Sequence, residues 1–474
     1  MKAETFRAYA HQVVDWMADY YQQIEQYPVK SQVKPGEILE QIPKNMPESG
    51  ESMDQILKDF NEVIMPGITH WQHPNYHSYF PANTSFPSLL GEMLTAALGA
   101  QCMIWDTSPA AAELEEAMMN WLKEVMQLPA EWEGSIQSTA SDATLNAILS
   151  AREKKTDFQI NKNGFLGNEK FRVYCSSQTH SSIEKGAKIA GIGSANTVKV
   201  GVDETFAMKP DLLRKAIQED IENGLTPLIV IAATGTTGST AMDPLTELGE
   251  ICQEFGIWFH VDAAYAGTAF LLPEFRDTQK GVELADSFVF NPHKWMFTNF
   301  DCTAYFVKDK GTLIRTFEIL PEYLKTQFDQ TVNNYRDWGI PLGRRFRALK
   351  LWFVMRNMGL SGMQEILRGH MTLTRDFVKK LEGHPDFEIL APVPLNLVCF
   401  RYKPQGMDEA QLNELNAQLV KSMNDCGEVY LTHTKLNGIY TLRVAIGQTY
   451  VQQKHVDKLW EVLLSHTSTL TPAL

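Results

Sequence analysis

Four short apolar segments in the middle of the chain constrain its fold more than any other feature. They are residues 171–177, 227–233, 257–264 and 287–293, and stretches with helical character separate them. A strand with one face in water alternates apolar and polar side chains, so a strand that is apolar almost throughout is covered on both faces. The order strand, helix, strand therefore predicts an α/β fold in which helices cover a largely parallel sheet.

Several helix starts are marked in the sequence. Asp243 followed by Pro244 predicts an N-cap and a first-turn proline. Ser181 and Glu184 have the spacing of a capping box. The small, hydroxyl-rich turn Ser138–Asp142 runs into an apolar helical stretch, which predicts a further helix start.

Both ends of the chain predict separate structural parts. Residues 5–25 carry the apolar stripe of an amphipathic helix, and a second such helix is predicted around residues 56–64. Two helices alone cannot bury both apolar faces, so we expect them to pack on another subunit or on the main domain. Near the other end, Asn437-Gly438 between two β-rich runs predicts a hairpin within a small αβ domain. The chain thus divides into a helical segment at 1–80, a large α/β domain at 81–370 and a small αβ domain at 371–474.

Charge and cysteine usage narrow the class of protein. The 474 residues include 43 Lys and Arg against 57 Asp and Glu, a net charge of −14, which disfavours nucleic acid and anionic membranes as partners. Six cysteines lie far apart without a CxxC pair, which predicts reduced thiols rather than a disulfide framework. With neither a signal-peptide pattern nor a long apolar run, we expect a cytoplasmic protein.

Chemically reactive residues stand where the predicted strands end. Asp262, Lys294 and His180 each follow an apolar strand, at the sheet edge where open α/β sheets bind ligands. A desolvated lysine becomes a nucleophile toward carbonyl carbons, and the turn Thr139–Ser141 at a helix start suits a phosphate. Taken singly, each residue also fits an ordinary role, as a solvated lysine or a helix cap.

Together these residues suit pyridoxal phosphate. The lysine forms a Schiff base, the aspartate keeps the pyridine nitrogen protonated, and the imidazole of His180 stacks on the ring. Ala264 is small enough to let the opposite ring face approach the strand.

Five longer motifs carry a family resemblance: HPNYHSYFPA (73–82), WDTSPAAAELE (105–115), HVDAAYAGTAF (260–270), FNPHKW (290–295) and DWGIPLGRRFRALKLW (337–352). The chain resembles the group II pyridoxal-phosphate decarboxylases of the aromatic L-amino acid decarboxylase type over nearly its whole length. The resemblance implies fold-type I, the aspartate-aminotransferase-like architecture. It also implies a homodimer with a swapped N-terminal helical layer, which makes residues 1–80 a dimerisation segment.

The resemblance also implies a role for each matching residue. Lys294 binds the cofactor carbonyl, Asp262 pairs with the pyridinium nitrogen, and His180 stacks on the ring. Tyr323 matches the tyrosine of the family's mobile loop, which protonates the substrate Cα. The other cofactor positions, which hold the phosphate or lie near the ring, are Thr139, Ala140, Ser141, Thr237, Ala264, Asn291 and His293. The positions that line the substrate pocket are Trp71, Tyr79, Phe80, Pro81, Ala82, Met103 and Gly343.

The expected reaction is decarboxylation of aromatic L-amino acids to arylalkylamines and CO₂. Methionine at 103 adapts to different rings, and Gly343 is the small residue that accompanies indole acceptance in plant relatives. We therefore expect breadth over phenylalanine, tyrosine, tryptophan and dopa. The alternatives are an aromatic aldehyde synthase, an aminotransferase with Arg443 as carboxylate clamp, and a catalytically silent binding protein.

Two other motifs suggest ligands that their sequence context does not support. His70, His73 and His77 are spaced closely enough to suggest a metal cluster, but Pro74 interrupts the helix that two ligands would share, so we expect no metal site. Gly235 and Gly238 lack the third glycine of a dinucleotide fingerprint, which makes a nicotinamide oxidoreductase the poorer interpretation.

Overall fold

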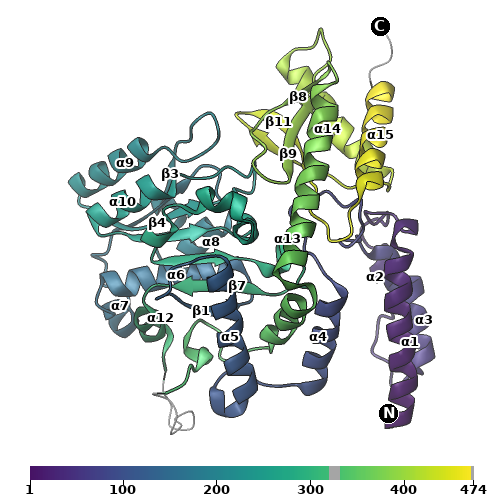
Figure 1. The fold of residues 1–474 in the computed structure, drawn as a ribbon, viewed down its shortest axis with the longest axis horizontal. Helices are drawn as coiled ribbons and strands as arrows, with labels where there is room; N and C mark the ends of the chain where they lie inside the picture. The colour runs from purple at the N-terminus through teal and green to yellow at the C-terminus, as the bar shows by residue number, and fades with distance from the viewer. Residues whose placement is uncertain (320–330, 471–474) are drawn as a thin grey trace. The chain divides into compact units, whose positions relative to one another are not determined.

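A computed structural model describes residues 1–319 and 331–470 of the chain (Figure 1). The chain forms two compact units. We call the unit made of Ala82–Met371 and Ala391–Leu397 the large unit, and the unit made of Met1–Pro81, Thr372–Leu390 and Val398–Leu474 the small unit. The three-part division with boundaries at 80/81 and 370/371 stays a prediction.

The large unit is built on a seven-stranded sheet with the order β1-β7-β6-β5-β4-β2-β3. Strands β3, β2, β4, β5 and β6 run parallel, whereas β7 is antiparallel to both β6 and β1. The strands are β1 (Glu133–Gln137), β2 (Phe171–Ser176), β3 (Thr197–Val200), β4 (Thr226–Ala233), β5 (Trp258–Asp262), β6 (Ser287–Phe290) and β7 (Thr303–Val307). All four apolar segments form neighbouring parallel strands, which confirms the predicted α/β fold.

Helices cover both faces of this sheet. Helices α6, α8 and α12 pack on one face, and α9 and α10 on the other (Figure 1). From Leu228 to Ala232 every β4 residue is at most 2% exposed, as expected for a strand covered on both sides. The helices of the large unit are α4 (Phe86–Leu98), α5 (Pro109–Val125), α6 (Ala140–Lys155), α7 (Gln159–Asn163), α8 (Ser182–Ile189), α9 (Pro210–Glu222), α10 (Leu245–Phe255), α11 (Pro292–Trp295) and α12 (Lys310–Phe317). Helix α13 (Arg347–Glu382), which is kinked at Gly359, begins in the large unit and ends in the small unit.

One predicted helix cap is wrong, and a second is correct in position but lacks the predicted capping box. The N-cap of α10 is Pro244, and the Asp243 carboxylate instead accepts the backbone N–H groups of Met208 and Ala233, each at 2.7 Å. Asp243 is buried among these donors, so its side chain joins two loops rather than capping the helix. Ser181 is the N-cap of α8 by position, but its side chain makes no capping hydrogen bond.

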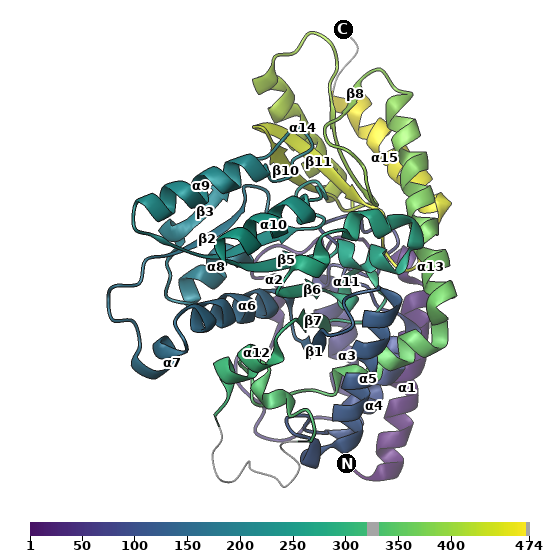
Figure 2. The same cartoon turned by 60° about the vertical axis from the view of Figure 1, so that its left-hand side comes forward.

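The small unit combines an antiparallel sheet with helices from both ends of the chain (Figure 2). Its strand order is β10-β11-β9-β8. Asn437 and Gly438 have φ angles of 51° and 82°, the left-handed region of a tight hairpin, which confirms the predicted turn. The elements are α1 (Ala3–Gln22), α2 (Glu37–Gln41), α3 (Met53–Asp59), β8 (Phe387–Ile389), β9 (Leu397–Tyr402), α14 (Glu409–Asp425), β10 (Thr432–Leu436), β11 (Ile439–Ala445) and α15 (Gln453–Leu470).

A buried ion pair fixes the segment that follows the undescribed residues 320–330. Arg344 donates to both carboxylate oxygens of Glu115, at 3.0 and 2.6 Å, and to the carbonyl of Ile136 at 2.7 Å. Glu115 also accepts the N–H of Ile136 at 2.7 Å, and both charged side chains are less than 10% exposed. The pair thereby links α5, β1 and the segment around Gly343.

Replacing Glu115 with glutamine should destabilise the fold by about 3–5 kcal/mol, because Arg344 would be left buried without its counter-charge. Chemical denaturation monitored by tryptophan fluorescence measures this change. Glu124→Gln, an exposed position on the same helix, is the matched control and should stay within about 0.5 kcal/mol of the wild type. Equal unfolding midpoints for the two variants would show that the ion pair is not structural.

Candidate active site

Four sequence-predicted features meet at one edge of the large sheet. Asp262 is the last residue of β5, Lys294 lies in α11 directly after β6, and His180 follows β2. Thr139 follows β1 and is the N-cap of α6. Because β2, β5 and β6 run parallel, their carboxyl ends lie along the same edge of the sheet. The negative charge of Asp262 acts to raise the pKa of both Lys294 and His180, so these three side chains influence one another's charge.

Asp262 is a nearly buried carboxylate, 9% exposed. Its Oδ1 accepts the backbone N–H of Ala264 at 3.0 Å, which fixes the carboxylate at the strand end. The backbone of the same residue pairs with both neighbouring strands, at Ala233 and Val289. A buried acid needs a cationic or donating partner. The carboxylate of Asp262 is therefore suited to bind a positively charged group at the end of β5.

Burial lowers the pKa of the Lys294 amine, and the negative charge of Asp262 works in the opposite direction. The backbone N–H of Lys294 donates to the Asn291 carbonyl at 2.9 Å, and the backbone carbonyl of Lys294 accepts the N–H of Asn83 at 3.4 Å. A lysine with a lowered pKa is uncharged more often at neutral pH than an exposed one. It is therefore suited to attack a carbonyl carbon and to exchange protons.

His180 is held as a neutral ring with a defined tautomer. Its Nδ1 accepts the backbone N–H of Ser182 at 3.1 Å and lies 2.8 Å from the Ser182 hydroxyl, so the ring proton is on Nε2. Desolvation lowers the pKa of this imidazole, Asp262 raises it and Lys294 lowers it further. An uncharged, oriented imidazole can lie against a planar aromatic ring.

The amino end of α6 forms a site for an anion. Thr139 and Asp142 form a reciprocal capping box, which confirms the predicted helix cap. This cap uses the backbone N–H groups of Thr139 and Asp142 and leaves those of Ala140 and Ser141 for an anion. Among the described residues, no protein oxygen accepts the backbone N–H groups of Ala140 and Ser141. These two donors and the positive end of the 16-residue helix favour a phosphate group at this point.

A threonine that the sequence reasoning missed supports this turn. Thr303, the first residue of β7, donates to the carbonyl of Ser138 at 3.2 Å and is 2.8 Å from the Asn291 Oδ1. Nothing in the sequence marked this residue, because its contacts depend on the antiparallel placement of β7 between β1 and β6. Next to it, His293 is buried and its Nδ1 accepts the N–H of Cys302 at 3.0 Å. Burial and the Lys294 charge lower the pKa of His293 to about 3.

Two further predicted cofactor positions follow the ends of β4 and β5. Thr237 is an exposed residue in the turn after β4. Ala264 follows Asp262 by two residues, and its carbonyl accepts the N–H of Asn291 at 3.0 Å. The small Ala264 side chain leaves room for a planar group at the strand end.

The predicted substrate-pocket residues belong to both units. In the large unit, the carbonyl of Met103 accepts the N–H of Arg336 at 2.8 Å, and Gly343 lies against Gln101, so these segments run side by side. Ala82 also belongs to the large unit, and the positions in the small unit are Trp71, Tyr79, Phe80 and Pro81. The rings of Trp71 and Tyr79 are stacked at 5.7 Å. Tyr323, the predicted proton donor, lies outside the described residues.

The three clustered histidines of the small unit are buried and have lowered pKa values. Desolvation lowers the pKa of His73 to about 4 and that of His77 to about 3, and it also lowers the pKa of His70. His70 Nδ1 pairs with the Tyr20 hydroxyl at 2.8 Å, and His73 Nδ1 accepts the N–H of Asn75 at 2.9 Å. Within residues 1–319 and 331–470, no group of three or more potential ligands is arranged to hold a metal ion.

The donor set at the sheet edge fits pyridoxal phosphate. A lysine amine with a lowered pKa suits the cofactor carbonyl, a buried carboxylate suits the protonated pyridine nitrogen, and two N–H groups at a helix start suit the phosphate. These residues therefore fit pyridoxal phosphate, the cofactor that the sequence predicted.

Comparison with known proteins agrees with this geometry. The pyridoxal-dependent decarboxylase conserved domain matches residues 35–403. Over 484 residues the chain is 43% identical to tyrosine decarboxylase 4 of Petroselinum crispum, covering 99% of this chain and 94% of that protein. It is also 43% identical over 480 residues to phenylacetaldehyde synthase of Arabidopsis thaliana, covering 99% and 97%. The crystal structure of Oryza sativa TDC with PLP and tryptamine superposes with a TM-score of 0.96 at 34% identity, covering 99% of both chains.

Proposed function

Because this chain belongs to the pyridoxal-dependent decarboxylase family, with pyridoxal phosphate as its cofactor, we propose that it converts aromatic L-amino acids to arylalkylamines and CO₂. The observation that carries the proposal is the placement of a desolvated lysine, Lys294, and a buried carboxylate, Asp262, at the ends of neighbouring strands. Names among the relatives support the aromatic substrate class, since they include a tyrosine decarboxylase and a structure that contains tryptamine.

When bound, pyridoxal phosphate supplies a carbonyl carbon for the substrate amine and a protonated pyridine ring that accepts electrons from the Cα–carboxylate bond. Lys294 holds the cofactor carbonyl and, once released, takes or gives a proton at its amine. Asp262 keeps a proton on the ring nitrogen through its negative charge. His180 lies against one face of the ring, and Ala264 leaves the other face accessible.

The remaining residues bind and orient. Ala140 and Ser141 donate their backbone N–H groups to the phosphate, with Thr139 shaping the turn and Asn291 and His293 beside it. Thr237 lies near the ring. Removal of water from the substrate carboxylate favours its loss, and an aromatic pocket provides that removal.

We assign the substrate pocket to Trp71, Tyr79, Phe80, Pro81, Ala82, Met103 and Gly343, and the final protonation of Cα to Tyr323. These assignments rest on the motif matches. Tyr323 in addition lies outside the described residues. The flexible Met103 and the absence of a side chain at Gly343 support acceptance of phenyl, phenol and indole rings.

A panel of four amino acids tests the proposal. The purified chain, incubated with pyridoxal phosphate and phenylalanine, tyrosine, tryptophan or dopa, should release CO₂ and the matching amine in equal amounts. Glutamate is the negative control. Turnover of glutamate without any aromatic substrate, or transfer of the amino group without CO₂, would overturn the proposed function.

An aromatic aldehyde synthase is the second candidate, because one relative at 43% identity is a phenylacetaldehyde synthase. The same incubations separate the two activities, since aldehyde formation consumes oxygen and yields ammonia and hydrogen peroxide. Tyr323 together with His180 favours the amine as the main product. An aminotransferase is the weaker alternative, because its proposed clamp Arg443 already donates to the Thr432 hydroxyl at 3.1 Å and lies over the Phe80 ring.

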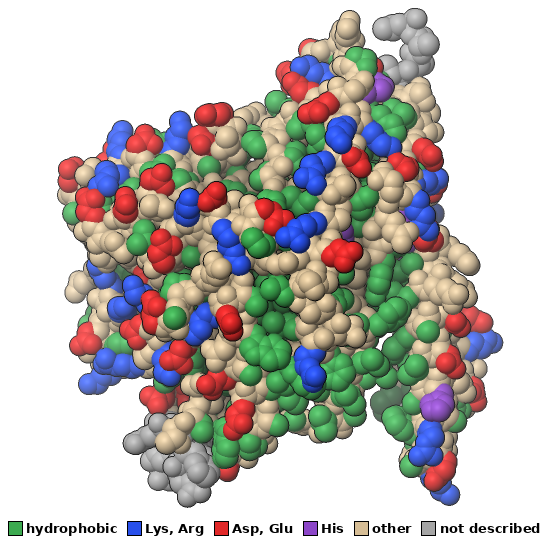
Figure 3. All heavy atoms as spheres, in the orientation of Figure 1, with side chains coloured by type: hydrophobic (Ala, Val, Ile, Leu, Met, Phe, Trp, Pro, Cys, Tyr) green, Lys and Arg blue, Asp and Glu red, His purple; other side chains and the backbone are tan. Residues whose placement is uncertain are grey.

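We further propose that the protein is a homodimer in the cytoplasm. Apolar side chains gather over α4 in the space-filling view (Figure 3). Phe86, Leu90, Leu94 and Leu98 recur every four residues along that helix and are 48%, 54%, 48% and 64% exposed, which makes one continuous apolar stripe. Such a stripe supports a protein partner, and the family resemblance supports a second copy. For the cytoplasmic location, the scattered free cysteines are the supporting feature; among the described residues, no helix is long and apolar enough to cross a bilayer.

Replacing Leu90 with aspartate should separate the dimer, because a charge in the middle of the α4 stripe would be buried at the interface. Light scattering on the eluted peak should give twice the 53.6 kDa of one chain for the wild type and the single-chain mass for Leu90→Asp. Leu166→Asp, at a loop position that is 69% exposed, is the matched control and should remain dimeric. A dimeric Leu90→Asp variant would exclude α4 from the interface.

A further inference from the structure

The start of strand β7 lies where two strands of the active-site edge end. Strand β7 is antiparallel to β1 on one side and to β6 on the other. Its first residue, Thr303, lies opposite Gln137, the last residue of β1. The next residue of β7 pairs with Phe290, the last residue of β6. Thr303 therefore lies between the turn that opens α6 and the turn that opens α11.

The hydroxyl of Thr303 contacts both of these turns. Its oxygen lies 2.8 Å from the side-chain Oδ1 of Asn291 and 3.2 Å from the backbone carbonyl oxygen of Ser138. Both partner atoms are acceptors, so one hydroxyl proton serves both, and the shorter distance favours Asn291. Thr303 is fully buried, so water does not compete for either contact.

The contact to Ser138 fixes the peptide group that precedes the proposed anion site. The carbonyl of the Ser138–Thr139 peptide accepts from Thr303, and its N–H donates to the Asp142 carboxylate at 3.2 Å. A peptide group held at both ends cannot rotate without losing a hydrogen bond. The two backbone N–H groups that follow are those proposed to bind the phosphate. The Thr303 hydroxyl therefore helps to set the direction in which they point.

The contact to Asn291 fixes a second donor. The backbone N–H of Asn291 donates to the Ala264 carbonyl at 3.0 Å, and its backbone carbonyl accepts the N–H of Lys294 at 2.9 Å. Its side chain is 2% exposed and does not cap α11. Among the described residues, none accepts a hydrogen bond from Nδ2 of this amide. With Oδ1 held by Thr303, the NH₂ group lies on the other side of the amide and suits an anion.

The residue before Thr303 holds a third predicted cofactor position. The backbone N–H of Cys302 donates to Nδ1 of His293 at 3.0 Å, and its carbonyl accepts the backbone N–H of His293 at 3.2 Å. Because Nδ1 accepts, the ring proton of His293 is on Nε2. The first turn of chain at the start of β7 thus contacts three of the segments that the family resemblance places near the phosphate.

We propose that Thr303 is a positioning residue for the cofactor phosphate: its hydroxyl holds the amino end of α6 and the amide of Asn291 in the directions that bind the anion. The proposal rests on the proposed function, in which these two groups lie at the phosphate. Thr303 does not touch the cofactor in this role, because it acts through the two groups that its hydroxyl holds. The affinity for the phosphate group should depend on this hydroxyl, whereas the affinity for the pyridine ring should not.

Binding to the apoenzyme, measured by quenching of tryptophan fluorescence without any amino acid, tests this role. The two probes are pyridoxal phosphate and pyridoxal, which lacks the phosphate. In Thr303→Val, which keeps a similar shape without the hydroxyl, the dissociation constant for pyridoxal phosphate should rise about tenfold, the effect of losing a buried hydrogen bond. The dissociation constant for pyridoxal should stay within about twofold. Thr303→Ser retains the hydroxyl and should restore the value for pyridoxal phosphate to within about threefold of the wild type.

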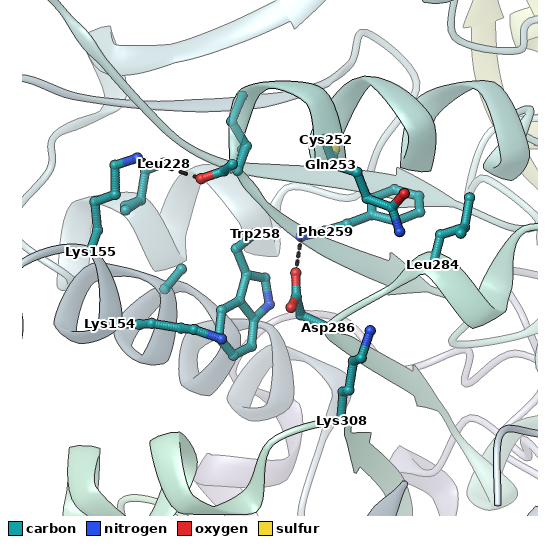
Figure 4. A pocket seen from close by; sticks show the side chains of 13 residues that line it. Lys154, Lys155, Leu228, Cys252, Gln253, Trp258, Phe259, Leu284, Asp286 and Lys308 are labelled. Carbon is teal, nitrogen blue, oxygen red and sulfur yellow. Dashed lines mark hydrogen bonds between the residues drawn. The ribbon is translucent and has the colours of Figure 1, made fainter. Parts of the chain in front are cut away.

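Lys308→Gln is the matched control from the other end of the same strand. Lys308 follows β7 and lines a cavity of about 430 Å³ at the amino ends of β4 and β5, the opposite edge of the sheet (Figure 4). Because this residue is remote from both turns, the variant should bind pyridoxal phosphate and pyridoxal as the wild type does.

The outcomes separate this inference from the proposed function. If the wild type binds pyridoxal phosphate no more tightly than pyridoxal, the phosphate site of the proposed function fails. If the wild type prefers pyridoxal phosphate and a folded Thr303→Val keeps that preference, only the role of Thr303 is overturned. Equal weakening of both compounds would overturn it as well, by showing a general structural effect. Should Thr303→Val fail to fold, Thr303→Cys carries a weaker donor; it should weaken the binding of pyridoxal phosphate alone, and an unchanged dissociation constant overturns the proposal.

Discussion

Replacing Lys294 with alanine is expected to abolish the visible absorbance band of the protein-bound cofactor and to reduce turnover by on the order of 10³-fold or more. The physical reason is the position of this amine after β6, where burial lowers its pKa and the charge of Asp262 acts on it. No other group at this edge combines nucleophilic character with that placement among the described residues. Absorbance spectra and amine release, measured on the same preparation, check both effects.

Lys215→Ala is the matched control for this experiment. Lys215 is an exposed lysine on α9 that pairs with Glu219, and it belongs to none of the predicted site segments. Its substitution should leave the band and the turnover unchanged. A Lys294→Ala variant that keeps the band and most of its activity would remove Lys294 from the proposed site.

Replacing Tyr323 with phenylalanine is expected to change the product rather than stop the reaction. Phenylalanine retains the ring but lacks the hydroxyl that we propose returns a proton to Cα, so the electron-rich carbon left after loss of CO₂ should become open to oxygen. The variant should therefore yield mainly the aromatic aldehyde with ammonia and hydrogen peroxide, whereas the wild type yields mainly the amine. Product analysis by mass spectrometry together with oxygen consumption measures the ratio.

Tyr440→Phe serves as the control for the loss of a tyrosine hydroxyl. Tyr440 lies in the hairpin strand β11, where its ring stacks on His433. That variant should retain the amine as its product. If Tyr323→Phe also gives the amine cleanly, another group donates the proton and the family-derived role of Tyr323 is wrong.

The strand ends were predictable because burial and chemistry coincide there. An apolar run that stops at Asp262 or at Asn291 and Lys294 carries two signals at once, a covered strand and a reactive residue at the ligand-binding edge. The structure confirms the strands and their parallel neighbours, and it places the predicted Asp262, Lys294 and His180 in one electrostatic environment. The roles of these residues remain to be tested by the experiments above.

Local cap signals were less reliable because tertiary contacts compete for the same side chains. Asp243 has the sequence context of an N-cap, yet two buried N–H groups on other segments take its carboxylate. Thr303 gave no sequence signal, because its contacts to Ser138 and Asn291 arise only when non-adjacent strands are placed side by side. Patterns along one segment predict its own periodicity, but not which distant backbone groups will need a partner.

The most direct test of the account is chemical trapping of the cofactor on the protein. The purified chain is reconstituted with pyridoxal phosphate, reduced with borohydride, digested and mapped by mass spectrometry. We predict one phosphopyridoxyl group per chain, attached to Lys294, and a large loss of labelling when Asp262 is replaced by asparagine. A label on a different lysine, or no label on a reconstituted and folded chain, would contradict the central claim that Lys294 and Asp262 form the catalytic centre.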